Sequence, residues 1–114
     1  MNYSDLYNAP LTPQTFSILL ALLAGENHSY GIRQRVEDDS QGMMTLSDGT
    51  LYAALKRLMA QGLVTKDEDR VYELTPAGQS KLRGELQRLK AMVRRAETRF
   101  VAQHYGLSEG PSWR

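Results

Sequence analysis

Residues 46–58 read Leu-Ser-Asp-Gly-Thr-Leu-Tyr-Ala-Ala-Leu-Lys-Arg-Leu, and this stretch decides the fold of the chain. Ser47 is a residue type that caps helix N-termini, and Asp48 adds a carboxylate in the first turn, where the helix dipole favours negative charge. Three leucines then recur at the spacing of one helical face: Leu51, Leu55 and Leu58. The stretch predicts a helix over residues 48–61 that ends at Gly62, since glycine readily adopts the left-handed conformation found after helices.

Two shorter helices are predicted before this stretch. The first opens at the pair Thr12-Pro13, a cap followed by a residue suited to the first helical position, and ends at Gly25. Its predicted apolar face consists of Phe16, Leu19, Leu20 and Leu23. The second helix is predicted at residues 30–39, with Ser29 as its cap. Its predicted inward residues are Ile32 and Val36.

A short hairpin and a long helix are predicted next. The strand candidates 63–66 and 71–74 flank the polar turn 67–70, a pattern typical of a β-hairpin. The pair Thr75-Pro76 repeats the cap-plus-proline signal and opens a helix that is predicted to run to about Tyr105.

The order of these elements predicts the fold class and the domain organisation. Three helices, a hairpin and a trailing helix predict a mainly α fold with a small β-hairpin (α+β), a winged helix-turn-helix followed by a long C-terminal dimerisation helix. The predicted parts are an N-terminal arm at 1–11, a DNA-binding winged helix-turn-helix domain at 12–75, the C-terminal helix at 76–105 and a flexible tail at 106–114.

Charge and composition narrow the function classes. The chain has 114 residues and a net charge of +1, but residues 1–74 hold six basic and ten acidic side chains, a net charge of −4. The part predicted to bind DNA is thus acidic, which counts against that function because phosphate neutralisation dominates DNA affinity. The sequence has no cysteine, so disulfides and thiolate metal sites are excluded.

Catalytic and metal-binding motifs are absent from the sequence. The histidines His28 and His104 lack metal-ligand spacing, and there is no glycine-rich phosphate loop and no serine-histidine-aspartate order. We therefore predict no enzyme activity, no cofactor and no metal. The start of the chain does not resemble a signal peptide, and the longest apolar stretch, residues 16–24, is too short to span a bilayer. We expect a cytoplasmic protein without a membrane partner.

Five blocks of sequence stand out when they are taken together. They are Leu11-Thr12-Pro13, His28-Ser29-Tyr30-Gly31-Ile32, residues 46–58, Gly62-Leu63-Val64 and Tyr72-Glu73-Leu74-Thr75-Pro76-Ala77-Gly78. In combination, over about residues 11–99, they resemble the PadR family of bacterial regulators, in its short branch with a single C-terminal helix. The resemblance implies a dimeric repressor of its own or a neighbouring gene, often one that senses small aromatic or drug-like molecules.

Two features depart from this resemblance. The turn at 67–70, which would form the wing, is short and acidic where many relatives have basic or longer wings. The pair Ser47-Asp48 stands where relatives often have proline before Gly-Thr. Both departures concern the contact with DNA more than the fold.

The outer side of the 48–61 helix is the predicted DNA-binding surface. With the leucines inside, helical geometry places five residues outside: Gly49, Thr50, Ala53, Lys56 and Arg57. Small residues at the start allow close approach to a duplex, and the two cations can reach phosphate or guanine. The alternative is an ordinary solvated helix face.

Four further residues complete the predicted DNA-binding set: Tyr30, Ser47, Tyr52 and Arg70. Both tyrosines can place a hydroxyl group on phosphate, and the resemblance supports this for Tyr52; the alternative is that each ring packs at the edge of the core. In the wing, three carboxylates repel phosphate, and Arg70, with Lys66 behind it, supplies the only attraction. We therefore favour a solvated turn without DNA contact.

The last predicted helix carries a heptad seam. Six apolar residues recur with spacings of 4, 3, 4, 3 and 4: Leu82, Leu86, Leu89, Val93, Ala96 and Phe100. The seam predicts a homodimer interface, because the helix extends too far for three short helices to cover it. The alternative is packing on its own domain. The basic residues of this helix are expected to be solvated.

A ligand pocket is the last expectation from the sequence. Phe16, Met92 and Phe100 are large, and methionine adapts to varied ligand shapes, so the resemblance suggests that they bind an aromatic effector, with Trp113 as a lid. The alternative, which we favour slightly, is that they only pack the core and the dimer interface.

The predicted function is that of a sequence-specific DNA-binding transcriptional regulator. We expect a dimeric repressor that binds double-stranded DNA at a palindromic operator and is released by a small aromatic effector. The alternative is a winged-helix protein-interaction module that does not bind DNA, which the acidic wing and the net charge of −4 would support.

Overall fold

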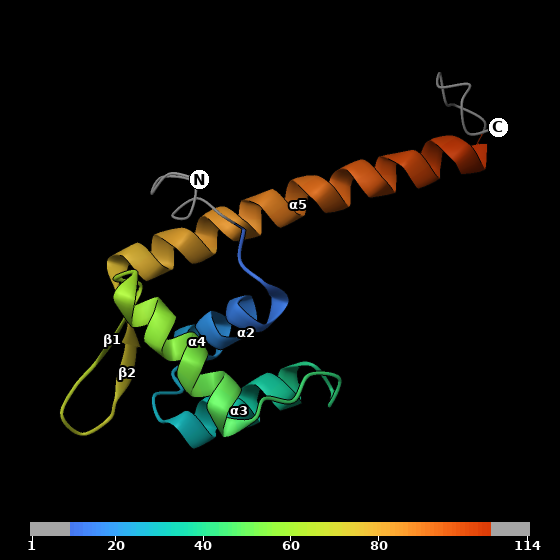
Figure 1. Ribbon diagram of the computed structural model, residues 1–114. Coiled ribbons are helices and arrows are strands. Elements are labelled where there is room, and N and C mark those ends of the chain that lie inside the picture. Colours follow the sequence, from blue (N-terminus) through green and yellow to red (C-terminus); the bar gives the residue numbers. More distant parts are fainter. Residues whose placement is uncertain (1–9, 106–114) are drawn as a thin grey trace. The chain divides into compact units, whose positions relative to one another are not determined.

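The computed structural model describes residues 10–105 and contains the predicted elements in the predicted order (Figure 1). They are α2 (Pro13–Leu23), α3 (Ser29–Asp39), α4 (Asp48–Ala60), β1 (Val64–Lys66), β2 (Tyr72–Leu74) and α5 (Pro76–Tyr105). The mainly helical fold with a small antiparallel hairpin is thus confirmed. Most of the predicted arm (1–9) and the predicted tail (106–114) lie outside the described residues.

The chain divides into two compact units, and the division falls between Arg83 and Gly84. The first unit therefore contains the winged helix together with the first turns of α5. The second contains the remainder of α5.

Three of the predicted helix caps are present. The hydroxyl oxygens of Thr12, Ser47 and Thr75 each accept a hydrogen bond from a backbone N–H three residues later, at 3.1, 3.1 and 2.9 Å. These bonds satisfy N–H groups that the first turn of a helix leaves without a partner. The sequence therefore places the starts of α2, α4 and α5 correctly.

The predicted cap at Ser29 is wrong. Ser29 is the first residue of α3, and His28 occupies the cap position without a side-chain hydrogen bond. The reason is a long-range contact: the Tyr72 N–H of β2 donates to the Asn27 carbonyl at 2.8 Å. This bond holds the chain extended through His28, so the helix begins at the next residue.

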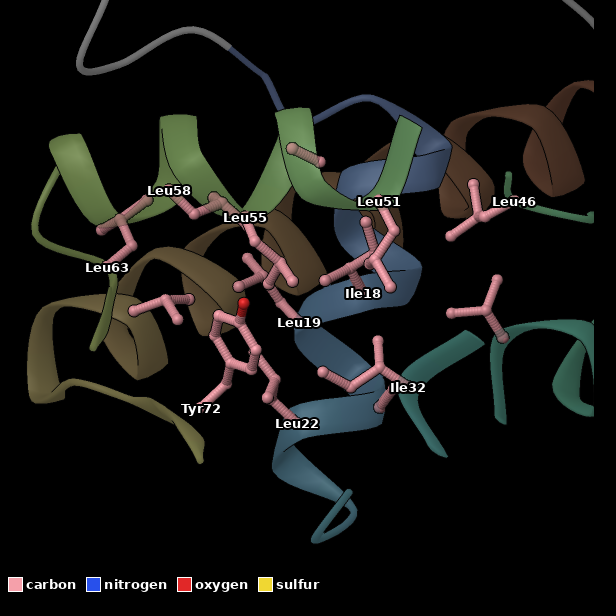
Figure 2. Close-up of a cluster of buried hydrophobic side chains, with 14 of the residues drawn as sticks. Ile18, Leu19, Leu22, Ile32, Leu46, Leu51, Leu55, Leu58, Leu63 and Tyr72 are labelled. Carbon is pink, nitrogen blue, oxygen red and sulfur yellow. The ribbon is translucent and has the colours of Figure 1, made fainter. Parts of the chain in front are cut away.

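One apolar core holds the first unit together (Figure 2). The inward residues predicted for α3 and α4 are all buried: Ile32, Val36, Leu51, Leu55 and Leu58. Figure 2 shows Leu51, Leu55 and Leu58 projecting from α4 toward α2, with the Tyr72 ring beside Leu22. Packing on this core fixes α4 within the winged helix and leaves its opposite side free.

The predicted inner face of α2 is largely wrong. The buried residues are Ile18, Leu19, Ala21 and Leu22. Leu20 and Leu23 are 38% and 55% exposed, and Phe16 is half-buried against the core. Because α2 is apolar almost all the way round, several stripes have helical spacing, and periodicity cannot choose among them.

The start of α5 is tied to the turn that ends α4. The Thr75 N–H donates to the Leu63 carbonyl at 3.1 Å, and the Thr75 hydroxyl donates to the Gly62 carbonyl at 2.7 Å. A Cβ atom on Gly78 would lie 2.1 Å from the Leu63 carbonyl oxygen. The approach of α5 to this backbone therefore requires glycine at position 78.

The β1–β2 hairpin is short and is closed by a side chain. Its register pairs Val64 with Leu74 and Lys66 with Tyr72. In the turn, an Asp67 carboxylate oxygen accepts hydrogen bonds from two backbone N–H groups, those of Asp69 at 2.8 Å and Val71 at 3.0 Å. One carboxylate of the acidic turn thus has a structural role.

Candidate nucleic-acid interface

The side of α4 that faces away from the core is exposed along its length. The five residues predicted to form it are all on the surface: Gly49, Thr50, Ala53, Lys56 and Arg57. Tyr52, predicted as a separate contact, is exposed as well. They come from one rigid helix, and the residues at its start are small. The surface can therefore approach a groove closely, as a recognition helix must.

Lys56 and Arg57 are the cations of this surface. Within the part of the chain that the structure describes, neither forms an ion pair. Their charged groups can therefore contact an external anion without first breaking an internal salt bridge.

The polar side chains in the first turn of α4 are already paired. The Ser47 hydroxyl donates to the Thr50 hydroxyl at 2.9 Å and accepts from the Thr50 N–H. The Asp48 carboxylate forms an ion pair with Arg33 of α3. The first turn thus presents small residues and a carboxylate whose charge a neighbouring helix neutralises.

The outer side of α3 adds aromatic and basic groups next to α4. Tyr30 is 72% exposed, so its ring does not pack in the core of the first unit. Tyr30 and Arg33 line a hollow whose other lining residues are Gln34, Glu37, Thr45 and Leu46. Arg35, on the same helix, forms an ion pair with Glu26 at 3.2 Å.

The two cations of the wing, Lys66 and Arg70, both lie close to Tyr72. The Lys66 ammonium group lies 5.9 Å from the centre of the Tyr72 ring, a distance suited to a cation–π contact. Arg70 adopts a left-handed backbone conformation with φ of 63°. Burial raises the pKa of the Tyr72 hydroxyl, the neighbouring Tyr52 raises it further, and Arg70 lowers it.

The predicted seam on α5 is divided between the two units. Leu82 is 5% exposed and belongs to the core of the first unit. In the second unit, Leu86, Val93, Ala96 and Phe100 are exposed, and Leu89 is half-buried. Arg88 donates to both carboxylate oxygens of Glu85, at 2.9 and 2.6 Å, and this bonding raises the pKa of Arg88.

The three residues predicted to bind an effector do not share one compact unit. Phe16 packs against the core of the first unit, whereas Met92 and Phe100 are exposed in the second. Trp113 lies outside the described residues. The pocket remains a prediction.

Between residues 10 and 105 the chain has neither a metal site nor a helix suited to a membrane. No group of three histidine, cysteine or acidic side chains in this range could hold a metal ion. None of the helices in the same range has the length and apolar character needed to cross a membrane.

A comparison with family profiles matches residues 18–84 to the Transcriptional regulator PadR-like family. The chain belongs to this family. The match begins within α2 and ends just after the first turns of α5, so it spans the winged helix from the middle of α2 onward and confirms the family resemblance predicted from the sequence. PadR-like proteins are transcriptional regulators rather than enzymes, and the chain is accordingly a transcription regulator.

Solved structures share the PadR-like fold over most of the chain. A transcriptional regulator from Clostridium thermocellum superposes with a TM-score of 0.61 at 19% identity, covering 88% of this chain and 99% of that one. The complex structure of hsRosR-S4 gives a TM-score of 0.62 at 24% identity, covering 92% and 99%. The complex structure of hsRosR-S1 gives 0.60 at 25% identity, covering 86% and 96%. Curated protein sequences give no match.

Arg33 is the residue of this PadR-like surface that sequence analysis missed. Its partner Asp48 lies fifteen residues later, so no local pattern joins the two. A partial signal existed, because Arg33 follows Tyr30 by three residues and must therefore share a side of α3 with it.

Proposed function

We propose that this regulator binds double-stranded DNA as a homodimer, with α4 in the major groove, and represses transcription from a palindromic operator in the cytoplasm. The observation that carries the proposal is the exposed outer side of α4, with small residues at its start and two cations that form no ion pair with any residue between 10 and 105. Tyr30, Ser47, Gly49, Thr50, Tyr52, Ala53, Lys56, Arg57 and Arg70 remain the proposed contacts.

The test is a titration of DNA from the flanks of the protein's own gene at several salt concentrations. Lys56→Ala and Tyr52→Phe should fold normally and bind more weakly. If Lys56 contacts a phosphate, its loss lowers the slope of log affinity against log salt by about one unit. Lys90→Ala, at an exposed lysine of α5, is the matched control. Unchanged affinity in both α4 variants would contradict the assignment of the recognition helix.

The proposed dimer uses the seam on α5 beyond the core residue Leu82. Leu86, Leu89, Val93, Ala96 and Phe100 form one stripe at coiled-coil spacing, and four of the five are exposed in the single chain. A symmetric pair of chains would cover this stripe and present two copies of α4 to the two halves of a palindrome.

Release by a small aromatic effector is the remaining part of the proposal. Phe16, Met92 and Phe100 are its candidate contacts, and a ligand would act by binding the DNA-competent and incompetent arrangements differently. Titration with planar aromatic cations and phenolic acids, followed by DNA binding at saturation, tests it. A lack of any effect on operator affinity would leave a repressor that needs no ligand.

A second candidate function is a protein-interaction module that does not bind DNA. Residues 1–74 carry a net charge of −4, and the exposed carboxylates of the wing contribute to it. This function predicts no binding to any duplex even at low salt, which the same titration would reveal.

A further inference from the structure

The ion pair between α3 and α4 is placed where the proposed DNA surface lacks positive charge. Asp48, the first residue of α4, carries a largely exposed carboxylate that would repel a phosphate if Arg33 did not pair with it. The cations of α4 itself, Lys56 and Arg57, come roughly two turns later along the helix. Arg33 is the cation that reaches the start of α4 in this structure.

The Arg33 guanidinium group has bonding capacity that Asp48 does not use. One terminal nitrogen, Nη1, binds the Asp48 carboxylate. The Nε atom is buried and has no hydrogen-bond partner among the described residues. A DNA phosphate cannot reach the buried Nε atom, so the contact falls to the other terminal nitrogen, Nη2, for which no hydrogen bond is found among the described residues. Arginine presents its donors in a fixed fork, so one side can hold a carboxylate while the other receives a phosphate.

The surroundings of Arg33 form a small hollow with further donors. Tyr30, Gln34 and Thr45 line it beside Arg33, and each carries a hydroxyl or amide group that can donate to an anion. The Glu37 carboxylate lines it too, one helical turn beyond Arg33. A phosphate would therefore sit at the Tyr30 side, toward the start of α3, where the helix dipole also favours it.

The size of the hollow limits what it can receive. Its volume is about 60 Å³. Pockets for drug-sized ligands measure roughly 300–1,000 Å³. The hollow is too small for an aromatic effector, whereas a phosphate group needs only to place its oxygens there.

We propose that Arg33, held by Asp48, is a phosphate contact that fixes the start of α4 on the DNA backbone. This inference rests on the proposed function and assigns to it a residue outside α4 and the wing. The contact carries no information about bases, because phosphates are the same at every step of the duplex. Arg33 therefore contributes equally to operator and non-operator DNA.

The test compares Arg33→Ala with Arg35→Ala on operator DNA and on an unrelated duplex. The two arginines are matched: both lie on α3, both form one ion pair, and their side chains are 38% and 41% exposed. Arg33→Ala should weaken binding to both duplexes by the same factor, about tenfold or more. It should also lower the slope of log affinity against log salt by about one unit. Arg35→Ala should leave affinity and slope close to those of the wild type.

A third variant separates phosphate contact from a structural role of the ion pair. Asp48→Ala breaks the same pair but keeps the arginine, so the salt slope should stay the same or become steeper. An equal loss of affinity in Asp48→Ala and Arg33→Ala would overturn the inference, as would an unchanged slope in Arg33→Ala or an equal fall in Arg35→Ala. If Arg33→Ala does not fold, the slope of log affinity against log salt is measured on Arg33→Gln instead. A wild-type chain that binds no duplex would overturn the proposed function as well.

Discussion

The unit that ends at Arg83 buries most of its apolar side chains, whereas the part of α5 that follows it exposes most of them. In the first unit, apolar side chains from every helix and from the hairpin meet in one core. In the second, residues 91–100 are all exposed, and Val93 and Phe100 are among them. The difference teaches that the winged helix is stabilised by its own contacts, whereas the exposed apolar residues of the seam are the surface on which the proposed dimer depends.

Two glycines on either side of this division give the largest expected contrast. Gly78→Ala should lower the free energy of unfolding by about 3 kcal/mol or more, because its Cβ would meet the Leu63 carbonyl at 2.1 Å. Gly84→Ala should raise it by about 1 kcal/mol, since nothing lies within 4 Å and alanine favours helix. Urea denaturation measures both, and equal effects of the two changes would refute this contrast.

The seam itself is tested by charge. Replacing Leu86 and Leu89 with lysine places two ammonium groups in the proposed dimer interface and should weaken dimerisation by at least about 100-fold, or ~2.7 kcal/mol. Sedimentation at micromolar concentration should then show monomers with a folded winged helix. Gln87→Lys, at an exposed position off the seam, is the control and should remain dimeric. A double variant that stays dimeric would exclude the seam.

Within the first unit, two neighbouring carboxylates of the wing should differ. Asp67→Ala removes the acceptor of two backbone hydrogen bonds and should lower the free energy of unfolding by about 1 kcal/mol. Glu68→Ala removes an exposed carboxylate from the same turn and should change stability by less than about 0.5 kcal/mol. Thermal melts of the two variants would show whether the turn depends on Asp67.

The smallest expected effect concerns pH. Burial raises the pKa of Tyr72, so the folded protein keeps this proton to a higher pH than the unfolded chain does. The contribution of Tyr72 to stability is therefore fully present below its unfolded pKa of about 10 and is lost as the pH rises above that value. Tyr72→Phe should flatten the fall in stability above about pH 10. A Tyr72→Phe variant whose stability falls with pH as steeply as that of the wild type would contradict this prediction.

The fold could be predicted from sequence wherever one local pattern had one interpretation. Ser47 with the three leucines of α4 fixed that helix, and the two Thr-Pro pairs marked the starts of α2 and α5. The inner face of α2 could not be predicted, because a helix that is apolar all round has no single stripe. The start of α3 depended on a hydrogen bond between Asn27 and Tyr72, which no local pattern encodes.

The part of the candidate site that lies on α4 could be predicted from the sequence, but the part on α3 could not. The outer residues of α4 follow from its inner leucines by helical geometry alone. Arg33 does not, because its role arises only when α3 and α4 are folded together. Leu82 illustrates a different limit: one stripe of α5 runs from the core into the exposed seam, and spacing alone cannot show where the core ends.

The bond between the Tyr72 N–H and the Asn27 carbonyl also bears on the order in which the chain folds. Each strand of the hairpin has three residues, and two-stranded hairpins are marginally stable at best in water. The wing therefore cannot form early as an independent nucleus; β2 gains its outer partner only when the α2–α3 loop has arrived. A peptide of residues 62–76 should show no hairpin by circular dichroism or NMR. Such a result would agree with a wing that takes its shape late, after the helices have assembled.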